Sequence, residues 1–181
     1  MKDNELYIEL KDTEYEYIKT THDRVVVRAI VIDKDGYFYF VRVNRCDEFG
    51  KAIVIETSGG GKEENEKIED SLKRELIEEL GVKVKIIKKI GIVSDYYNLI
   101  YRHNINHYYL CMIEEFRENN MTDDEINKFH LSILKLTYSE ALKEYNKNKE
   151  YKLGRLIQNR EQRILEKSKE LLDDLSIKYK Y

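Results

Sequence analysis

Three glutamates that lie close together in the sequence could bind a metal ion. Glu78 and Glu79 follow Glu75 by three and four residues. At about 100° per residue, a helix would place the three carboxylates within an arc of about 100°. Like charges at these spacings destabilise a helix, so their clustering beside an apolar stripe suggests a compensating cation. Carboxylate oxygens are hard ligands that suit Mg²⁺ or Mn²⁺ better than zinc.

Taken alone, an acidic pair on a helix is usually a solvated face, so the neighbouring residues decide the interpretation. Three consecutive glycines, Gly59, Gly60 and Gly61, stand just before the acidic segment. They lie between an expected strand and an expected helix, where a backbone without side chains can approach an anion closely. Loops collect glycine in any case, so this feature is also weak by itself.

Both features belong to one longer pattern. Residues 60–82 read Gly60-x5-Glu66-x7-Arg74-Glu75-Leu76-x-Glu78-Glu79-x-Gly81-Val82. Position for position, this stretch resembles the box that defines the Nudix hydrolase superfamily. The chance of matching all these positions in a chain of this composition is below about one in a million. The expected strands and helices around the box also resemble a Nudix domain, from residue 24 to about residue 172.

The resemblance implies an α+β fold, an α/β/α sandwich with a mixed sheet. It also implies hydrolysis of a diphosphate bond in a nucleoside diphosphate linked to another moiety, by water attack at phosphorus. On this basis Glu75 and Glu79 are direct metal ligands, and Glu78 holds another metal ion or orients a bound water. The carbonyl of Gly59 would complete the coordination of Mg²⁺ or Mn²⁺.

The implied catalytic residues are Glu78, Glu79, Arg74 and Glu125. Arg74 would pair with Glu66 and fix the carboxylates, while divalent ions would lower the pKa of a bound water and stabilise the leaving phosphate. A general base is also required. In several family members it is a glutamate in a loop beyond the box, and Glu125 lies in such an acidic loop. In other members a glutamate of the box is itself the base.

Backbone groups of Gly60 and Gly61 are expected to contact the substrate. Arg28, Arg42 and Arg45 lie on or just after the first expected hairpin and could bind phosphate or ribose, and Arg28 and Arg42 are the two we assign to substrate binding. The chain has no proline, so it lacks the proline downstream of the box that is associated with ADP-ribose-cleaving members, and this disfavours ADP-ribose. No NADH-pyrophosphatase-like signature follows the box, and this disfavours NADH. Modified nucleoside triphosphates, nucleotide sugars, dinucleoside polyphosphates and capped RNA remain.

Periodicity predicts the elements that position these residues. Apolar residues every four positions predict a helix over 66–80 that ends at Gly81, and further helices are expected at 139–145 and 155–175. A turn at 33–36 should join the first long strands into a hairpin. Residues 1–20 are expected to be an extension containing a short hairpin or edge strands. Strands are expected at 6–10, 15–18, 24–32, 37–43, 52–55, 82–87, 90–94, 106–113 and 131–136.

Composition bounds the remaining possibilities. A length of 181 residues suits one domain, and 32 basic against 35 acidic residues give a net charge of -3. This balance gives no electrostatic reason to expect a nucleic-acid or membrane partner. The resemblance implies a small nucleotide-type substrate, with a capped RNA end as the exception among nucleic acids. Cys46 and Cys111 are expected to be reduced, and no apolar run long enough for a span is present, so we expect a cytoplasmic protein. A homodimer stays an open alternative.

The alternative function is a Nudix-like nucleotide sensor or binding module without enzymatic activity. Such modules commonly lose glutamates of the box. All of Glu75, Glu78 and Glu79 are retained here, so the sequence favours the enzyme.

Overall fold

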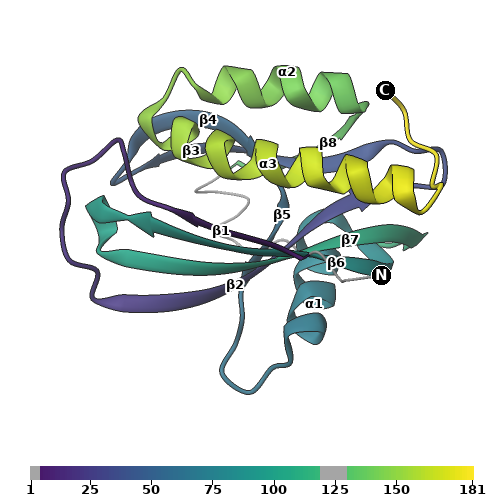
Figure 1. The fold of residues 1–181 in the computed structure, drawn as a ribbon, viewed down its shortest axis with the longest axis horizontal. Coiled ribbons are helices and arrows are strands. Elements are labelled where there is room, and N and C mark those ends of the chain that lie inside the picture. Colours follow the sequence, from purple (N-terminus) through teal and green to yellow (C-terminus); the bar gives the residue numbers. More distant parts are fainter. Residues whose placement is uncertain (1–4, 119–129) are drawn as a thin grey trace.

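The computed structural model describes residues 5–118 and 130–181. Its strands are β1 (Leu6–Leu10), β2 (His22–Ile32), β3 (Phe38–Asp47), β4 (Gly50–Glu56), β5 (Ser58–Gly61), β6 (Val82–Tyr97), β7 (Arg102–Phe116) and β8 (Ser132–Leu136). Its helices are α1 (Ile68–Leu80), α2 (Tyr138–Asn148), α3 (Lys152–Asp174) and a 3-10 turn at Asn98–Ile100. Helix α1 lies on one side of the strands, and α2 and α3 lie on the other (Figure 1). The predicted α+β fold is confirmed.

The strands form one mixed sheet in the order β1-β6-β7-β2-β3-β4, with β5 paired to β2 and β8 paired to β3. The β1–β6 and β2–β7 pairs are parallel, and the other pairs are antiparallel. Along one edge, β2 pairs with β5 at residues 26–29 and with β3 only at residues 31–32. Strand β3 therefore separates from β2 beside β5, and a pocket opens between them.

The central strand β2 is buried on both faces, which explains its nearly continuous run of Val and Ile. Because side chains alternate along a strand, one set of residues packs with α1 and the other with α2 and α3. The first cluster includes Val27, Ala29 and Val31 with the leucines of α1. The second includes Ile30 and Ile32 with apolar residues of α2 and α3. The sheet is thus anchored on both sides.

Helix α1 presents the predicted stripe to the core, since Leu72, Leu76 and Leu80 are buried. It ends at Gly81, whose φ of 63° lies in the left-handed region and whose N–H donates to the carbonyl of Ile77 at 3.0 Å. The same helix carries the box glutamates. Packing of the leucine stripe therefore fixes the direction in which the carboxylates point.

Residues 6–10 form an edge strand, one of the two alternatives expected for the N-terminal segment, because β1 pairs in parallel with β6 at the edge of the sheet. Three other expectations were wrong. Residues 15–18 are not a strand. The glycines are not an open loop, because residues 58–61 pair with β2 as β5. The runs at 82–87 and 90–94 join into the single strand β6, whose pairing with β7 has register shifts. For the glycines, pairing with a strand far away in sequence decided the outcome, and periodicity does not reveal such pairing.

Candidate active site

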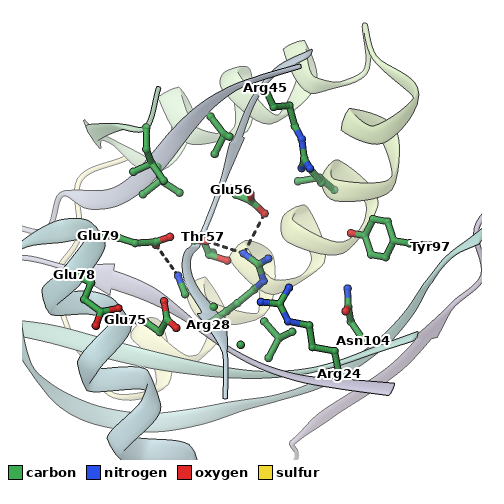
Figure 2. Close-up of a pocket in the computed structure, with 18 of the residues that line it drawn as sticks. Arg24, Arg28, Arg45, Glu56, Thr57, Glu75, Glu78, Glu79, Tyr97 and Asn104 are labelled. Atoms are coloured by element: carbon green, nitrogen blue, oxygen red, sulfur yellow. Dashed lines mark hydrogen bonds and ion pairs between the residues drawn. The ribbon is translucent and has the colours of Figure 1, made fainter. Parts of the chain in front are cut away.

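A pocket of about 550 Å³ opens where β3 parts from β2. Glutamates of α1 and the glycines of β5 line it together with residues from β2, β3, β4, β6, β7 and α3. In Figure 2 the labelled Glu75, Glu78 and Glu79 lie on one side of Arg28, and Arg24 and Asn104 lie on the other. The pocket therefore has an acidic wall and a wall rich in arginine.

Glu79 is the most closely held of the box carboxylates. Its side chain is buried, and one carboxylate oxygen accepts hydrogen bonds from Ser58 Oγ at 2.6 Å and from the N–H of Gly59 at 2.9 Å. Burial raises the pKa of Glu79 to about 8, although these two donors oppose the shift, and the charges of Glu75 and Glu56 raise it further. A buried carboxylate in this environment is stabilised by a cation.

Glu75 lies against the glycines of β5. A Cβ on Gly60 would overlap the Glu75 carboxylate, so only glycine lets this carboxylate approach the strand so closely. Gly59 has φ of +146°, and a side chain there would collide with the backbone of Val27 on β2. Both glycines are therefore required by close contacts, one with a carboxylate and one with a neighbouring strand.

Arg74 links the carboxylates to one another. Its Nη1 contacts Glu75 at 2.8 Å and Glu78 at 3.0 Å, while Nε and Nη2 contact Glu66 at 2.8 and 3.0 Å. The expected Arg74–Glu66 pair is thus present, with the two-point geometry that a guanidinium offers a carboxylate. Hydrogen bonding by Arg74 lowers the pKa of Glu66 to about 2. Arg74 therefore holds the carboxylates of Glu75 and Glu78 in place.

The residues fit a divalent cation in their chemistry. Glu75, Glu78 and Glu79 supply carboxylate oxygens beside a backbone rich in carbonyls, which is the donor set that Mg²⁺ and Mn²⁺ prefer. Burial, and then the nearby charges of Glu75 and Glu56, raise the pKa of Glu79, so a bound cation would stabilise its ionised form. As positioned in residues 5–118 and 130–181, no three acidic, histidine or cysteine side chains form a ready-made metal cluster. Glu75 and Glu78 share the Arg74 guanidinium instead.

A network of buried charges forms the floor of the pocket. Arg28 contacts Glu56 at 3.1 Å and donates to the carbonyl of Thr57 at 2.9 Å. Burial alone would lower the pKa of Arg28, but Glu56, Tyr108 and Glu161 together hold it above its ordinary value. Arg28 therefore fixes the chain just before β5.

Glu161 of α3 also binds the segment just before β5. It is fully buried and accepts hydrogen bonds from the N–H of Thr57 at 3.0 Å, from Tyr108 Oη at 2.7 Å and from Arg160 Nε at 3.0 Å. Arg160 also contacts Asp95 at 2.7 Å. Burial raises the pKa of Glu161, but the charges of Arg160 and Arg28 and the hydrogen bonds from Tyr108 and Thr57 together outweigh burial and lower it. Helix α3 is thus tied to Thr57, the residue that joins β4 to β5.

The structure brings together most of the residues that the sequence assigned to the site. Arg28, Arg74, Gly59, Gly60, Gly61, Glu75, Glu78 and Glu79 all line the pocket. Glu125 lies outside the described residues. Arg42 does not line the pocket, because side chains of β3 alternate and Arg42 points toward α2, where it pairs with Glu144 at 3.1 Å. The structure therefore places Arg42 outside this pocket, whereas Arg28 lies within it.

Arg45 was a sequence candidate that was not among the residues assigned to the substrate. It shares a face of β3 with Val41 and Val43, and it is the β3 arginine that lines the pocket. The spacing of two residues along β3 was the signal that separates it from Arg42. On the other strands, the further polar lining residues are Arg24, Glu56, Thr57, Glu63, Tyr97, Arg102 and Asn104. These residues are far apart in the sequence, and strand pairing brings them together around the pocket.

Comparison with known proteins agrees with this geometry. A family model described as the NUDIX domain matches residues 22–154. The chain belongs to the Nudix family. Members of this family are typically divalent-metal-dependent pyrophosphohydrolases. No curated protein sequence matches the Nudix chain.

Solved structures show the same fold at low sequence identity. A NUDIX hydrolase from Nitrosomonas europaea superposes with a TM-score of 0.63 at 15% identity, covering 88% of this chain and 93% of that one. A structure described as an ADP compounds hydrolase gives 0.60 at 18% identity, covering 91% and 80%. A MutT NUDIX hydrolase from Burkholderia pseudomallei gives 0.53 at 19% identity, covering 66% and 86%. No described helix of the Nudix protein is long and apolar enough to cross a membrane.

Proposed function

We propose that this Nudix protein hydrolyses a diphosphate bond in a nucleoside diphosphate linked to another moiety, with Mg²⁺ or Mn²⁺ as cofactor. One observation carries the proposal. Glu75, Glu78 and Glu79 line one wall of a 550 Å³ pocket directly beside the glycines of β5, and Glu79 is buried there with two fixed hydrogen-bond donors. A pocket of this size can accommodate a nucleotide-sized ligand.

In this proposal Glu75 and Glu79 hold the ion directly, and Glu78 holds a further ion or orients the attacking water. When bound, the ion would neutralise negative charge on the diphosphate oxygens and lower the pKa of a coordinated water. The chain's own residues position these groups. Ser58 and the N–H of Gly59 fix one oxygen of Glu79, so its other oxygen is free to face the pocket.

Arg74 and the backbone of β5 complete the acidic wall. Arg74 keeps Glu75 and Glu78 at a common position, and its pairing with Glu66 anchors the guanidinium at the start of the helix. The absence of a side chain at Gly60 leaves room for the carboxylate. Because the carboxylates are already oriented, less conformational freedom is lost when the substrate binds. The general base is Glu78 or Glu125, and the latter lies outside the described residues.

A panel assay tests the proposal. Purified protein is incubated with nucleoside triphosphates, nucleoside diphosphate sugars, ADP-ribose, dinucleoside polyphosphates and capped RNA, each with Mg²⁺, with Mn²⁺ or with EDTA. The ADP-linked compounds are included because one similar structure is described as an ADP compounds hydrolase. We expect metal-dependent release of a nucleotide or phosphate from at least one member of the panel.

Water labelled with ¹⁸O sharpens the assay, since attack at phosphorus places the label on a phosphate product. Mass spectrometry of the products then identifies the bond that was broken. Failure to turn over any panel member with either metal would contradict the proposal, and binding without turnover would favour the nucleotide-sensor alternative. Label found only outside phosphate would contradict attack at phosphorus.

A further inference from the structure

We infer that Arg24, Arg102 and Asn104 form an anion subsite that binds a phosphate group of the substrate in addition to the diphosphate that is cleaved. This inference rests on the proposed function and narrows its substrate class. It favours substrates that carry an extra phosphate, such as a nucleoside triphosphate or a nucleotide linked to a phosphorylated sugar. Substrates whose second moiety is neutral should be bound less tightly.

The three residues come together through the pairing of β2 with β7. These strands are parallel, and the Cα of Arg24 is opposite that of Asn104 while Arg102 is opposite His22. Residues at every second position of a strand share a face, so Arg102 and Asn104 point to the same side. All three line the pocket. In Figure 2, Arg24 and Asn104 lie across Arg28 from the box glutamates.

Polar atoms in this group lack partners. Asn104 is 4% exposed, and its side-chain oxygen has no hydrogen-bond partner in the part of the chain that the structure describes. The same is true of the buried Nε of Arg102. Within the described ranges, the Arg24 guanidinium forms no hydrogen bond or ion pair either. Buried polar groups are nearly always satisfied, so these atoms indicate a ligand.

The charges of the lining residues indicate that this ligand is an anion. The other arginines that line the pocket are paired with carboxylates, Arg28 with Glu56, Arg45 with Asp47 and Arg74 with Glu66, Glu75 and Glu78. Arg24 and Arg102 add two positive charges without such partners among the described residues. Two neighbouring like charges repel each other, so an anion between them is stabilised on both sides.

The chemistry of the groups indicates phosphate. Guanidinium groups match phosphate oxygens with paired N–H donors, and an amide oxygen can accept the proton of a hydroxyl or of a singly protonated phosphate. The Arg102 guanidinium also lies 5.8 Å from the centre of the Tyr97 ring, which limits its freedom to turn away. The Arg24 guanidinium lies directly beside Gly61 of β5, since a Cβ built on Gly61 would be 2.7 Å from its Nη2 atom.

Kinetics of charge-removing variants test the subsite. Arg24→Gln and Arg102→Gln are compared with wild type on a nucleoside triphosphate, on a nucleoside diphosphate linked to a phosphorylated sugar and on the analogue with a neutral sugar. We expect KM to rise about tenfold or more for a phosphate-bearing substrate, as for loss of a charge-assisted hydrogen bond. For the neutral analogue KM should change by less than about twofold.

The two phosphate-bearing substrates also show which phosphate the subsite binds. The substrate whose KM rises in Arg24→Gln and Arg102→Gln is the one that places its extra phosphate there. The matched control is Arg163→Gln, an exposed arginine of α3 that does not line the pocket and should leave every KM unchanged. Equal losses on all three substrates, or no loss in either variant, would overturn the subsite.

A binding measurement separates failure of the subsite from failure of the proposed function. Inorganic tripolyphosphate is titrated into metal-free protein by calorimetry, so no turnover is needed. Wild type should bind about tenfold or more tightly than Arg102→Gln. If wild type turns over no substrate yet shows this difference, the proposed function fails and the subsite stands. If turnover is present but wild type and variant bind equally, the subsite fails alone.

Discussion

Replacing Glu161 by alanine removes the carboxylate that ties α3 to the strand before the glycines. Glu161 is fully buried and accepts hydrogen bonds from Thr57, Tyr108 and Arg160. The substitution leaves a backbone N–H and the hydroxyls of Tyr108 and Tyr145 without their acceptor, and it removes one counter-charge of a buried arginine. Asp95 still neutralises Arg160 in part, at 2.7 Å.

The magnitude follows from these contacts. Removing one partner of a buried ion pair costs about 3–5 kcal/mol, because it leaves a buried charge that is no longer compensated. Retention of the Asp95 contact places the expected loss near the lower end, at about 3 kcal/mol. Urea unfolding followed by circular dichroism measures it. With a slope of about 2–3 kcal/mol per molar urea, the midpoint should fall by about 1–1.5 M.

Glu166→Ala is the matched control, since Glu166 lies on the same helix but is exposed. It should change the free energy of unfolding by about 0.5 kcal/mol or less. Glu161→Gln keeps an acceptor oxygen and should fall between the two. A loss for Glu161→Ala below about 1 kcal/mol, or equal to that of Glu166→Ala, would refute the view that this network supports the pocket.

Three further predictions concern the acidic wall. In the metal-free folded protein the pKa of Glu79 is about 8, above the ordinary 4.5, so the folded state binds its proton more tightly than the unfolded state does. The melting temperature should therefore fall as pH rises toward and through about 8. Glu79→Gln should remove this fall. Gly60→Ala should displace the Glu75 carboxylate and reduce kcat about tenfold or more in steady-state assays. Arg74→Lys keeps the charge but not the two-point geometry, so a Mn²⁺ titration of activity should need several-fold more metal, and an unchanged titration curve would contradict the linking role of Arg74.

The sequence revealed those parts of the site that are local in the chain. The box, the helix that carries it and the cap at Gly81 lie within one short segment, where spacing alone determines which residues share a face. Residues brought together by strand pairing were not predictable in this way. Arg24 and Arg102 are far apart in the sequence and lie near each other because β2 and β7 pair in parallel.

The two arginines of β3 show which signal was available. Arg42 and Arg45 differ by an odd number of positions, so they face opposite sides of the strand, and only one of them could line the pocket. Helix α3 offered a similar signal. Arg160 and Glu161 interrupt the apolar stripe between Ile157 and Ile164, at positions that packing should bury. Charged residues at such positions indicate a buried network.

The most direct test of the central claim compares Mg²⁺-dependent turnover of wild type and Glu79→Gln on the best substrate of the panel. Glutamine nearly preserves the shape of the side chain but removes the negative charge that the ion requires. We predict that wild type is active, that EDTA abolishes this activity, and that the variant loses about 10²-fold or more in kcat while its circular dichroism spectrum is unchanged. Equal turnover by the two folded proteins would contradict the assignment of this wall as the metal-dependent catalytic site.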